Sequence, residues 1–237
     1  MGAVYMLTLR QLSGRWRLLI MTVLAAMPVL IAALMLRSNN APSVSEFETA
    51  ILSAMLAGSI TPLVVLAMAG AAFANEIEDR TIANLTLTPI PRWKIVLPKL
   101  LAAFTLAAPF IAVSAFVTGH IAFLGDLRAT LAITVSAVIG VALYASAFTW
   151  LGLMTTQAIG VGLLYIVLWE GFFSGFVAGA RALSIRHYAI AVMHGLDPRR
   201  FAGQGHLSFG LAIAVVVLVC GGFLWLAVRR LRRMEIP

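Results

Sequence analysis

The sequence predicts an all-α, polytopic membrane protein with six transmembrane helices. The mean hydropathy is +1.00. Hydrophobic residues make up 62% of the 237 residues and charged residues only 11%, which is far more apolar than a soluble domain requires. The apolar residues also fall into six runs of about 20 residues, the length that crosses a hydrocarbon core as a helix. We therefore expect a single transmembrane domain over residues 1–237.

Short polar stretches separate the predicted spans. Arg17 and Arg37 bound the first span, and Gly125 with Asp126 is expected to make a tight turn between the third and fourth. Prolines inside the apolar runs are compatible with membrane helices, because neighbouring helices satisfy the carbonyl that each proline frees. The predicted spans cover residues 18–36, 50–74, 100–124, 129–153, 158–180 and 207–228.

The N-terminal residues Met1–Arg17 mix large apolar side chains with arginines. Tyr5 and Trp16 are aromatic, whereas Arg10 and Arg15 are basic. A helix of this kind lies in the membrane interface, with its apolar face toward the acyl chains. We predict an N-terminal interfacial helix that is retained, because the following span lacks a convincing signal-peptide cleavage site.

The distribution of basic residues predicts the orientation of the chain. Six spans place both termini on one side, together with the loop between the second and third spans. That side holds eleven of the 17 Lys and Arg residues, and the other side holds six. The positive-inside rule therefore predicts cytoplasmic termini. The net charge of +8 indicates contact with anionic membrane lipid rather than with nucleic acid, since the arginines flank apolar runs.

The longest polar break in the chain is residues 75–99, NEIEDRTIANLTLTPIPRWKIVLPK. Asn75 is a favourable N-cap, and acidic side chains crowd the following turn, where the helix dipole favours negative charge. Pro89 and Pro91 then end the helix, because proline has no amide hydrogen and disfavours helical backbone in the residue before it. The pattern predicts a short helix between the second and third spans.

This stretch resembles the first cytoplasmic loop of ABC-2 type ABC transporter permeases. The resemblance rests on the run Glu76-Ile77-Glu78-Asp79-Arg80-Thr81-Ile82, followed by Pro89, Arg92 and Lys99. In that family the loop forms a cytoplasmic coupling helix that docks on the ATP-binding subunit. The resemblance therefore implies a partner-binding role for Glu76, Ile77, Glu78, Asp79, Arg80, Thr81, Ile82, Pro89 and Arg92. The alternative is a solvated loop whose charges only fix the topology.

The resemblance also implies an assembly and a function. A permease of this family pairs with two ATP-binding subunits and with a second permease, expected to be a copy of itself, and it is expected to be an exporter. The sequence contains no Gly-x-x-x-x-Gly-Lys-Ser/Thr phosphate loop, so the chain is not expected to be an enzyme. ATP and Mg²⁺ would bind to the partner ATPase, and no cofactor or metal is expected in this chain. The Ala- and Arg-rich, Lys-poor composition is typical of a GC-rich bacterial genome, so the expected location is a bacterial plasma (inner) membrane.

One acidic residue, Glu170, lies deep inside a predicted span. An unpaired carboxylate in hydrocarbon costs roughly a few kcal/mol, so Glu170 is expected to find a donor on a neighbouring helix or to stay protonated. Gly171, Gly175 and Gly179 follow at four-residue spacing, which allows another helix to approach closely. We interpret these four residues as an intramembrane polar and packing site. A polar contact on the transport path is the alternative for Glu170.

Three other functions compete with the ABC permease. An ion-coupled secondary transporter would use Glu170, but the sequence has no inverted repeat. A non-transporting membrane scaffold would need none of these features. An intramembrane protease would use Ser174, yet no histidine sits mid-span to activate it. The four histidines also lack metal-ligand spacing, and we expect them in interfacial loops.

Overall fold

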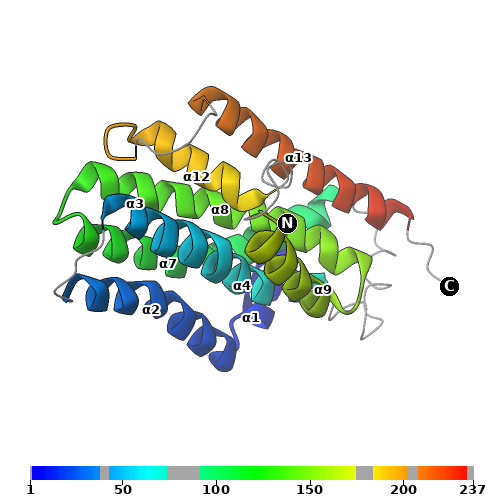
Figure 1. Ribbon diagram of the computed structural model, residues 1–237. Helices are drawn as coiled ribbons and strands as arrows, with labels where there is room; N and C mark the ends of the chain where they lie inside the picture. The colour runs from blue at the N-terminus through cyan, green and yellow to red at the C-terminus, as the bar shows by residue number, and fades with distance from the viewer. Residues whose placement is uncertain (1, 38–42, 74–90, 175–183, 202–207, 234–237) are drawn as a thin grey trace.

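The computed structural model describes residues 2–37, 43–73, 91–174, 184–201 and 208–233, and the regular structure in these ranges is helical (Figure 1). They contain eight continuous helices. Five of the eight are long and apolar enough to cross a membrane: Arg15–Arg37, Val44–Phe73, Trp93–Ala122, Leu127–Met154 and Phe209–Arg233. The prediction of an all-α polytopic membrane protein is therefore confirmed.

The fifth predicted span, residues 158–180, is only partly described. Helix α9 (Ala158–Leu164) continues into η3 (Tyr165–Phe173), whose turns are widened to the π type. At 1.5 Å per residue this apolar helix reaches about 24 Å, less than the roughly 30 Å of a hydrocarbon core. Residues 175–180 lie outside the described ranges. Five helices thus have the length and composition of membrane spans, and the sixth span stays a prediction.

The second span begins six residues earlier than its apolar run. Ser43 Oγ accepts a hydrogen bond from the Glu46 amide (3.3 Å), and the Glu46 carboxylate accepts one from the Ser43 amide (2.8 Å). This capping box satisfies amides that have no partner within the helix, whereas hydropathy alone treats both residues as loop. The span comprises α3 (Val44–Phe47), η1 (Glu48–Ile60), α4 (Thr61–Val65) and η2 (Leu66–Gly70) and stays helical to Phe73.

Helix α7 (Trp93–Ala122) also begins earlier than predicted, seven residues before the expected start of the third span. It therefore includes both lysines of the chain, Lys94 and Lys99, within its first two turns. Long lysine side chains allow this, because their methylene stems cover apolar surface. Pro98 and Pro109 lie inside α7, and the helix continues through both.

The tight turn predicted between the third and fourth spans is confirmed. Leu124 and Gly125 both have positive φ angles, 50° and 82°, and glycine adopts this backbone without steric cost. Asp126 then caps α8 (Leu127–Met154): its Oδ1 accepts from the Arg128 amide at 3.1 Å and from the Ala129 amide at 3.4 Å.

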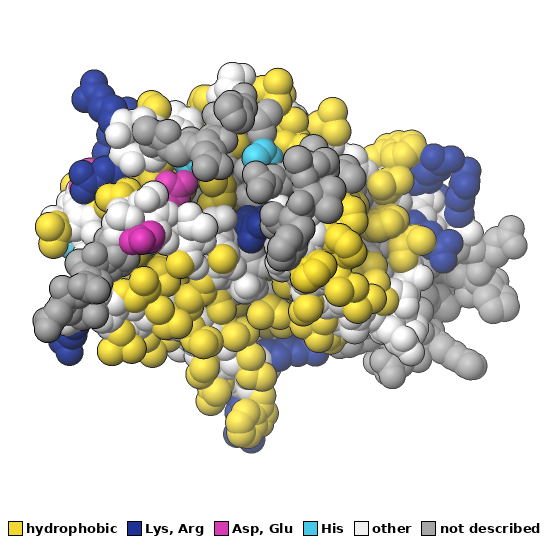
Figure 2. All heavy atoms as spheres, in the orientation of Figure 1, with side chains coloured by type: hydrophobic (Ala, Val, Ile, Leu, Met, Phe, Trp, Pro, Cys, Tyr) yellow, Lys and Arg dark blue, Asp and Glu magenta, His cyan; other side chains and the backbone are white. Residues whose placement is uncertain are grey.

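The second span and α8 form the centre of the bundle. In each, 67% of the most apolar stretch is buried, compared with 22% for α2 (Arg15–Arg37) and 11% for α13 (Phe209–Arg233). Figure 1 accordingly shows α2 and α13 along opposite sides of the bundle. Hydrophobic side chains cover much of the visible face between the two ends, and Lys and Arg lie toward the ends and at a few places between them (Figure 2). This surface suits hydrocarbon rather than water.

Besides the α9–η3 helix, two described helices lie outside the five long spans. Helix α1 (Gly2–Leu12) precedes α2 and is held to α7 by a hydrogen bond of 3.0 Å between the Tyr5 and Thr105 hydroxyls. An N-terminal helix is therefore present, and its placement in the membrane interface stays a prediction. Helix α12 (Ile185–Leu196) lies in the longer polar segment between the fifth and sixth predicted spans and packs against α8 and α13.

Candidate functional site

Glu170 is completely buried within η3, and hydrogen-bond donors surround its carboxylate. Its Oε1 accepts from the Tyr165 hydroxyl and from the Ile185 amide, both at 3.0 Å, and its Oε2 accepts from the Ser184 hydroxyl at 2.5 Å. Tyr165 belongs to the same helix, whereas Ser184 and Ile185 begin α12. The carboxylate thus joins the fifth apolar helix to α12.

The first turn of α12 explains why a carboxylate suits this position. Amides at a helix N-terminus have no partner within the helix, and the helix dipole there attracts negative charge. Ser184 is the N-cap and accepts from the His187 amide at 3.3 Å, while Glu170 accepts from the next residue, Ile185. Two side chains from different helices therefore cap α12 together.

A second set of contacts extends this polar group toward the second span. The Ser174 hydroxyl donates to the Glu170 carbonyl at 2.7 Å and accepts from Arg186 Nη2 at 2.7 Å. The Arg186 side chain also lies against Gly58: a Cβ added to Gly58 would be 2.9 Å from its Cδ and Nη1. Glu170, Ser174, Ser184 and Arg186 therefore bring the fifth helix, α12 and the second span together.

The sequence indicated Glu170 but not its partners. Ser184 precedes an amphipathic run with serine in the favoured N-cap position, so the start of α12 was accessible to prediction. The pairing of that start with Glu170, 14 residues earlier, depends on how the chain turns between them. For Tyr165 and Arg186, the sequence shows only polar residues in or near an apolar run, which does not predict that they join this polar group.

The predicted glycine face is described at one position. Gly171 is exposed, and within the described ranges a Cβ added to it would meet only the Ile166 carbonyl of its own helix, at 3.6 Å. Gly175 and Gly179 lie outside the described residues. The described part of the chain therefore leaves Gly171 open to a neighbour.

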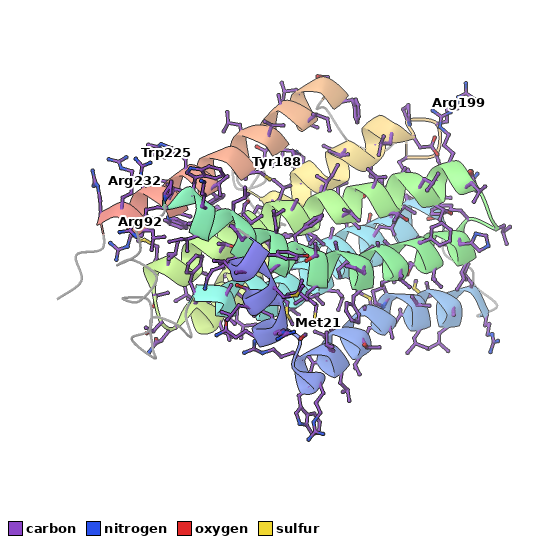
Figure 3. The ribbon with its side chains drawn as sticks, turned by 180° about the vertical axis from the view of Figure 1, so that it is seen from behind. Met21, Arg92, Tyr188, Arg199, Trp225 and Arg232 are labelled. Atoms are coloured by element: carbon purple, nitrogen blue, oxygen red, sulfur yellow. The ribbon has the colours of Figure 1, made fainter. Side chains whose placement is uncertain are left out.

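Most of the predicted partner-binding residues lie outside the described ranges. These are Glu76, Ile77, Glu78, Asp79, Arg80, Thr81, Ile82 and Pro89. The structure describes the residues on either side of the segment, Phe73 before it and Pro91 after it. Arg92 is the N-cap residue of α7, and its carbonyl accepts from the Ile95 amide at 3.1 Å. Arg92 lies at the same end of the molecule as Trp225 and Arg232, with Arg199 at the opposite end (Figure 3).

Phe73, the last described residue before this segment, packs in an apolar cluster. Its side chain is completely buried. Residues of three other long helices complete the cluster. Its remaining buried members are Ile95 and Val96 of α7, Leu153 of α8, and Ala227 and Leu231 of α13. We call these six residues the junction cluster. The end of the second span therefore contacts the corresponding ends of three other long helices.

The opposite end of the bundle holds a partly buried ionisable pair. His194 Nε2 of α12 lies 2.5 Å from Glu48 Oε1 of the second span, and each side chain is 15% exposed. Nearby, Arg128 Nε lies 3.8 Å from the buried Asp197 carboxylate. The expectation that the histidines sit in interfacial loops is thus wrong for the three described histidines, since His120 lies in α7 and His187 and His194 lie in α12.

An apolar groove of about 530 Å³ runs between α2 and α7. Its wall carries no charged side chain, and the hydroxyl of Thr22 is occupied by the Leu18 carbonyl at 2.8 Å. The other hydroxyl of the lining belongs to the buried Ser114. This mainly apolar wall suits a hydrocarbon chain better than a hydrated ion. The groove is lined by Thr22, Ala25, Ala26, Val29, Leu30, Pro109, Phe110, Val113, Ser114 and Val117.

Comparison with known proteins identifies one matching family. The model described as ABC-2 family transporter protein matches residues 9–180, more than two thirds of the chain. The match extends from α1 through Glu170 and ends before α12. No curated protein matches the chain.

Proposed function

Because the chain belongs to the ABC-2 family of transporter membrane proteins, we propose that this permease is driven by ATP hydrolysis in a separate ATP-binding subunit. The family match over residues 9–180 is the observation that carries the proposal. Permease domains of this family are typically non-catalytic and associate with ABC ATPase subunits. In this proposal ATP and Mg²⁺ bind to the ATP-binding subunit, and the permease forms the path along which the substrate crosses the membrane.

The ATP-binding subunit docks, in this proposal, on the segment between the second span and α7. The segment carries Glu76, Glu78, Asp79 and Arg80 within five residues, a charged surface suited to a protein partner. Its two flanks support the assignment. Phe73 sits in the junction cluster, and Arg92 lies at the end of the molecule that also carries the C-terminal arginines (Figure 3). Such a basic end favours the cytoplasmic side.

We further propose a complex of two permease copies and two ATP-binding subunits in a bacterial plasma membrane. Exposed apolar residues on the fifth helix, including Val167 and Phe172, support a second copy as neighbour, as does the open position at Gly171. Closure of the ATPase pair on ATP would push on both docking segments. The two bundles would then change their relative position and release substrate on the outer side.

Removing the charges of the docking segment tests this proposal. We expect Glu76→Ala/Glu78→Ala/Arg80→Ala to leave the permease folded, because solvent-facing charges change stability by less than about 0.5 kcal/mol. Binding of the ATP-binding subunit should weaken, since loss of docked charge pairs costs roughly 2–5 kcal/mol. Co-purification and ATP hydrolysis by the purified complex measure this.

Arg199→Ala is the matched control, because Arg199 lies at the opposite end of the molecule (Figure 3). It should retain the partner at the wild-type level. Wild-type co-purification by the triple variant would mean that the segment only fixes the topology.

A further inference from the structure

Lys99 is a buried cation at the base of the proposed docking segment. It lies in α7 and is only 1% exposed. Its Nζ donates a hydrogen bond to the Ala72 carbonyl at 2.7 Å and lies 4.4 Å from the centroid of the Phe73 ring. Ala72 and Phe73 end the described part of the second span, directly before residues 74–90. One side chain of α7 therefore holds the last described turn of the second span, directly before the proposed docking segment.

The chemistry of this contact suits a cation rather than an apolar side chain. A buried backbone carbonyl needs a hydrogen-bond donor, and a charged donor makes the stronger bond. An ammonium group satisfies such a carbonyl, and the face of an aromatic ring attracts it further. A lysine that only fixed topology would extend its ammonium group into water, but Lys99 is buried.

The surroundings of Lys99 leave the second span little freedom to move alone. Phe73 belongs to the junction cluster, which includes residues of α7, α8 and α13. On the α8 side, a Cβ added to Gly152 would be 2.8 Å from the Gly70 carbonyl, so the two backbones are already in close contact. Residues 74–90 join this tightly packed turn at one end and the start of α7 at the other, so a displacement of them acts on both helices.

We propose that Lys99 is a positioning residue that fixes the end of the second span to α7, so that a push on the docking segment moves both helices together. The inference rests on the proposed function, in which the ATP-binding subunit supplies that push. Without the ammonium group, the last described turn of the second span would yield locally, and the part of the push that the second span carries would no longer reach α7. The predicted consequence is uncoupling rather than loss of docking.

The test measures movement of α7 in the complex of the permease with its ATP-binding subunit. Spin labels are placed at Val113→Cys on α7 and Leu218→Cys on α13, both exposed positions, in a Cys220→Ala background. The distance between them is measured without nucleotide and with ATP and vanadate. We expect the wild-type distance to change, and Lys99→Met to lose most of that change while still binding the partner and hydrolysing ATP.

Lys94→Met is the matched control, because Lys94 lies on the same helix and its Nζ lies 5.6 Å from the ring of its neighbour Trp93. It should keep the wild-type change, and Lys99→Arg should restore part of it. A merely structural role would instead lower thermal stability without reducing the distance change in the intact complex. If Lys99→Met does not accumulate, Phe73→Leu removes the ring and is expected to reduce the change as well.

An unaltered distance change in Lys99→Met, or in Phe73→Leu if that variant carries the test, would overturn the inference and leave the proposed function standing. A wild-type complex that hydrolyses ATP without any distance change would contradict the coupling on which the inference rests. A wild-type chain that binds no ATP-binding subunit would contradict the proposed function itself.

Discussion

Glu170→Leu should strongly destabilise the protein and release the start of α12. The substitution leaves the Tyr165 hydroxyl, the Ser184 hydroxyl and the Ile185 amide without their acceptor inside an apolar bundle. Each buried donor left unpaired costs about 1–3 kcal/mol. We expect a lower yield of the folded protein, a lower Tm, and faster hydrogen exchange at residues 185–196 than in the wild type.

Glu170→Gln is the matched variant and should largely preserve folding and transport. The amide oxygen can still accept from Tyr165 and Ile185, and the Ser184 hydroxyl can rotate to accept from the new amide nitrogen. The contrast between Leu and Gln separates a structural role from a role in transport. If Gln abolished transport while the complex remained intact, Glu170 would belong to the transport path, and an ion-coupled mechanism would gain support.

Gly152→Ala should also be strongly destabilising, although alanine is normally the better helix residue. A Cβ at position 152 would lie 2.8 Å from the Gly70 carbonyl, which belongs to the backbone of the second span and cannot rotate away. Forcing two packed helices apart costs about 1–3 kcal/mol. This exceeds the gain of roughly 0.5–1 kcal/mol that alanine brings over glycine within a helix. Thermal unfolding in detergent measures the difference.

Gly222→Ala provides the control, with an effect of opposite sign. Gly222 lies in α13, and in the described structure a Cβ there meets nothing within 4 Å. The Tm of the Gly222→Ala variant should therefore equal or exceed that of the wild type. If Gly152→Ala and Gly222→Ala changed the Tm by the same amount, the close approach between α8 and the second span would not contribute to stability.

The helices were predictable from the sequence because hydrocarbon imposes a simple requirement. A segment that spans the membrane must be apolar for about 20 residues, and it must satisfy its own backbone. The long helices therefore appear where the apolar runs are. Their starts were less predictable, since Ser43 with Glu46 and Lys94 with Lys99 extend helices through polar residues. Helix capping and the burial of lysine side chains determine where these helices begin. A hydropathy profile takes neither effect into account.

The candidate site was predictable only in part, because its contacts join segments that are distant in sequence. The cost of burying a carboxylate singled out Glu170, but its donors from Ser184 and Ile185 depend on the position of α12. Likewise, the sequence placed Lys99 at the start of an apolar run, and only the packed bundle brings it to the Ala72 carbonyl. Composition identifies which groups need partners, whereas the fold determines which partners they find.

The central claim is that a separate ATP-binding subunit docks on residues 74–90, and photocrosslinking from single positions tests it most directly. A photoreactive amino acid is placed at position 78, within the segment, or at position 199, at the opposite end of the molecule (Figure 3). We expect a covalent adduct with the ATP-binding subunit from position 78 and none from position 199. An adduct from position 199 alone, or no adduct with the ATP-binding subunit from position 78, would contradict the claim.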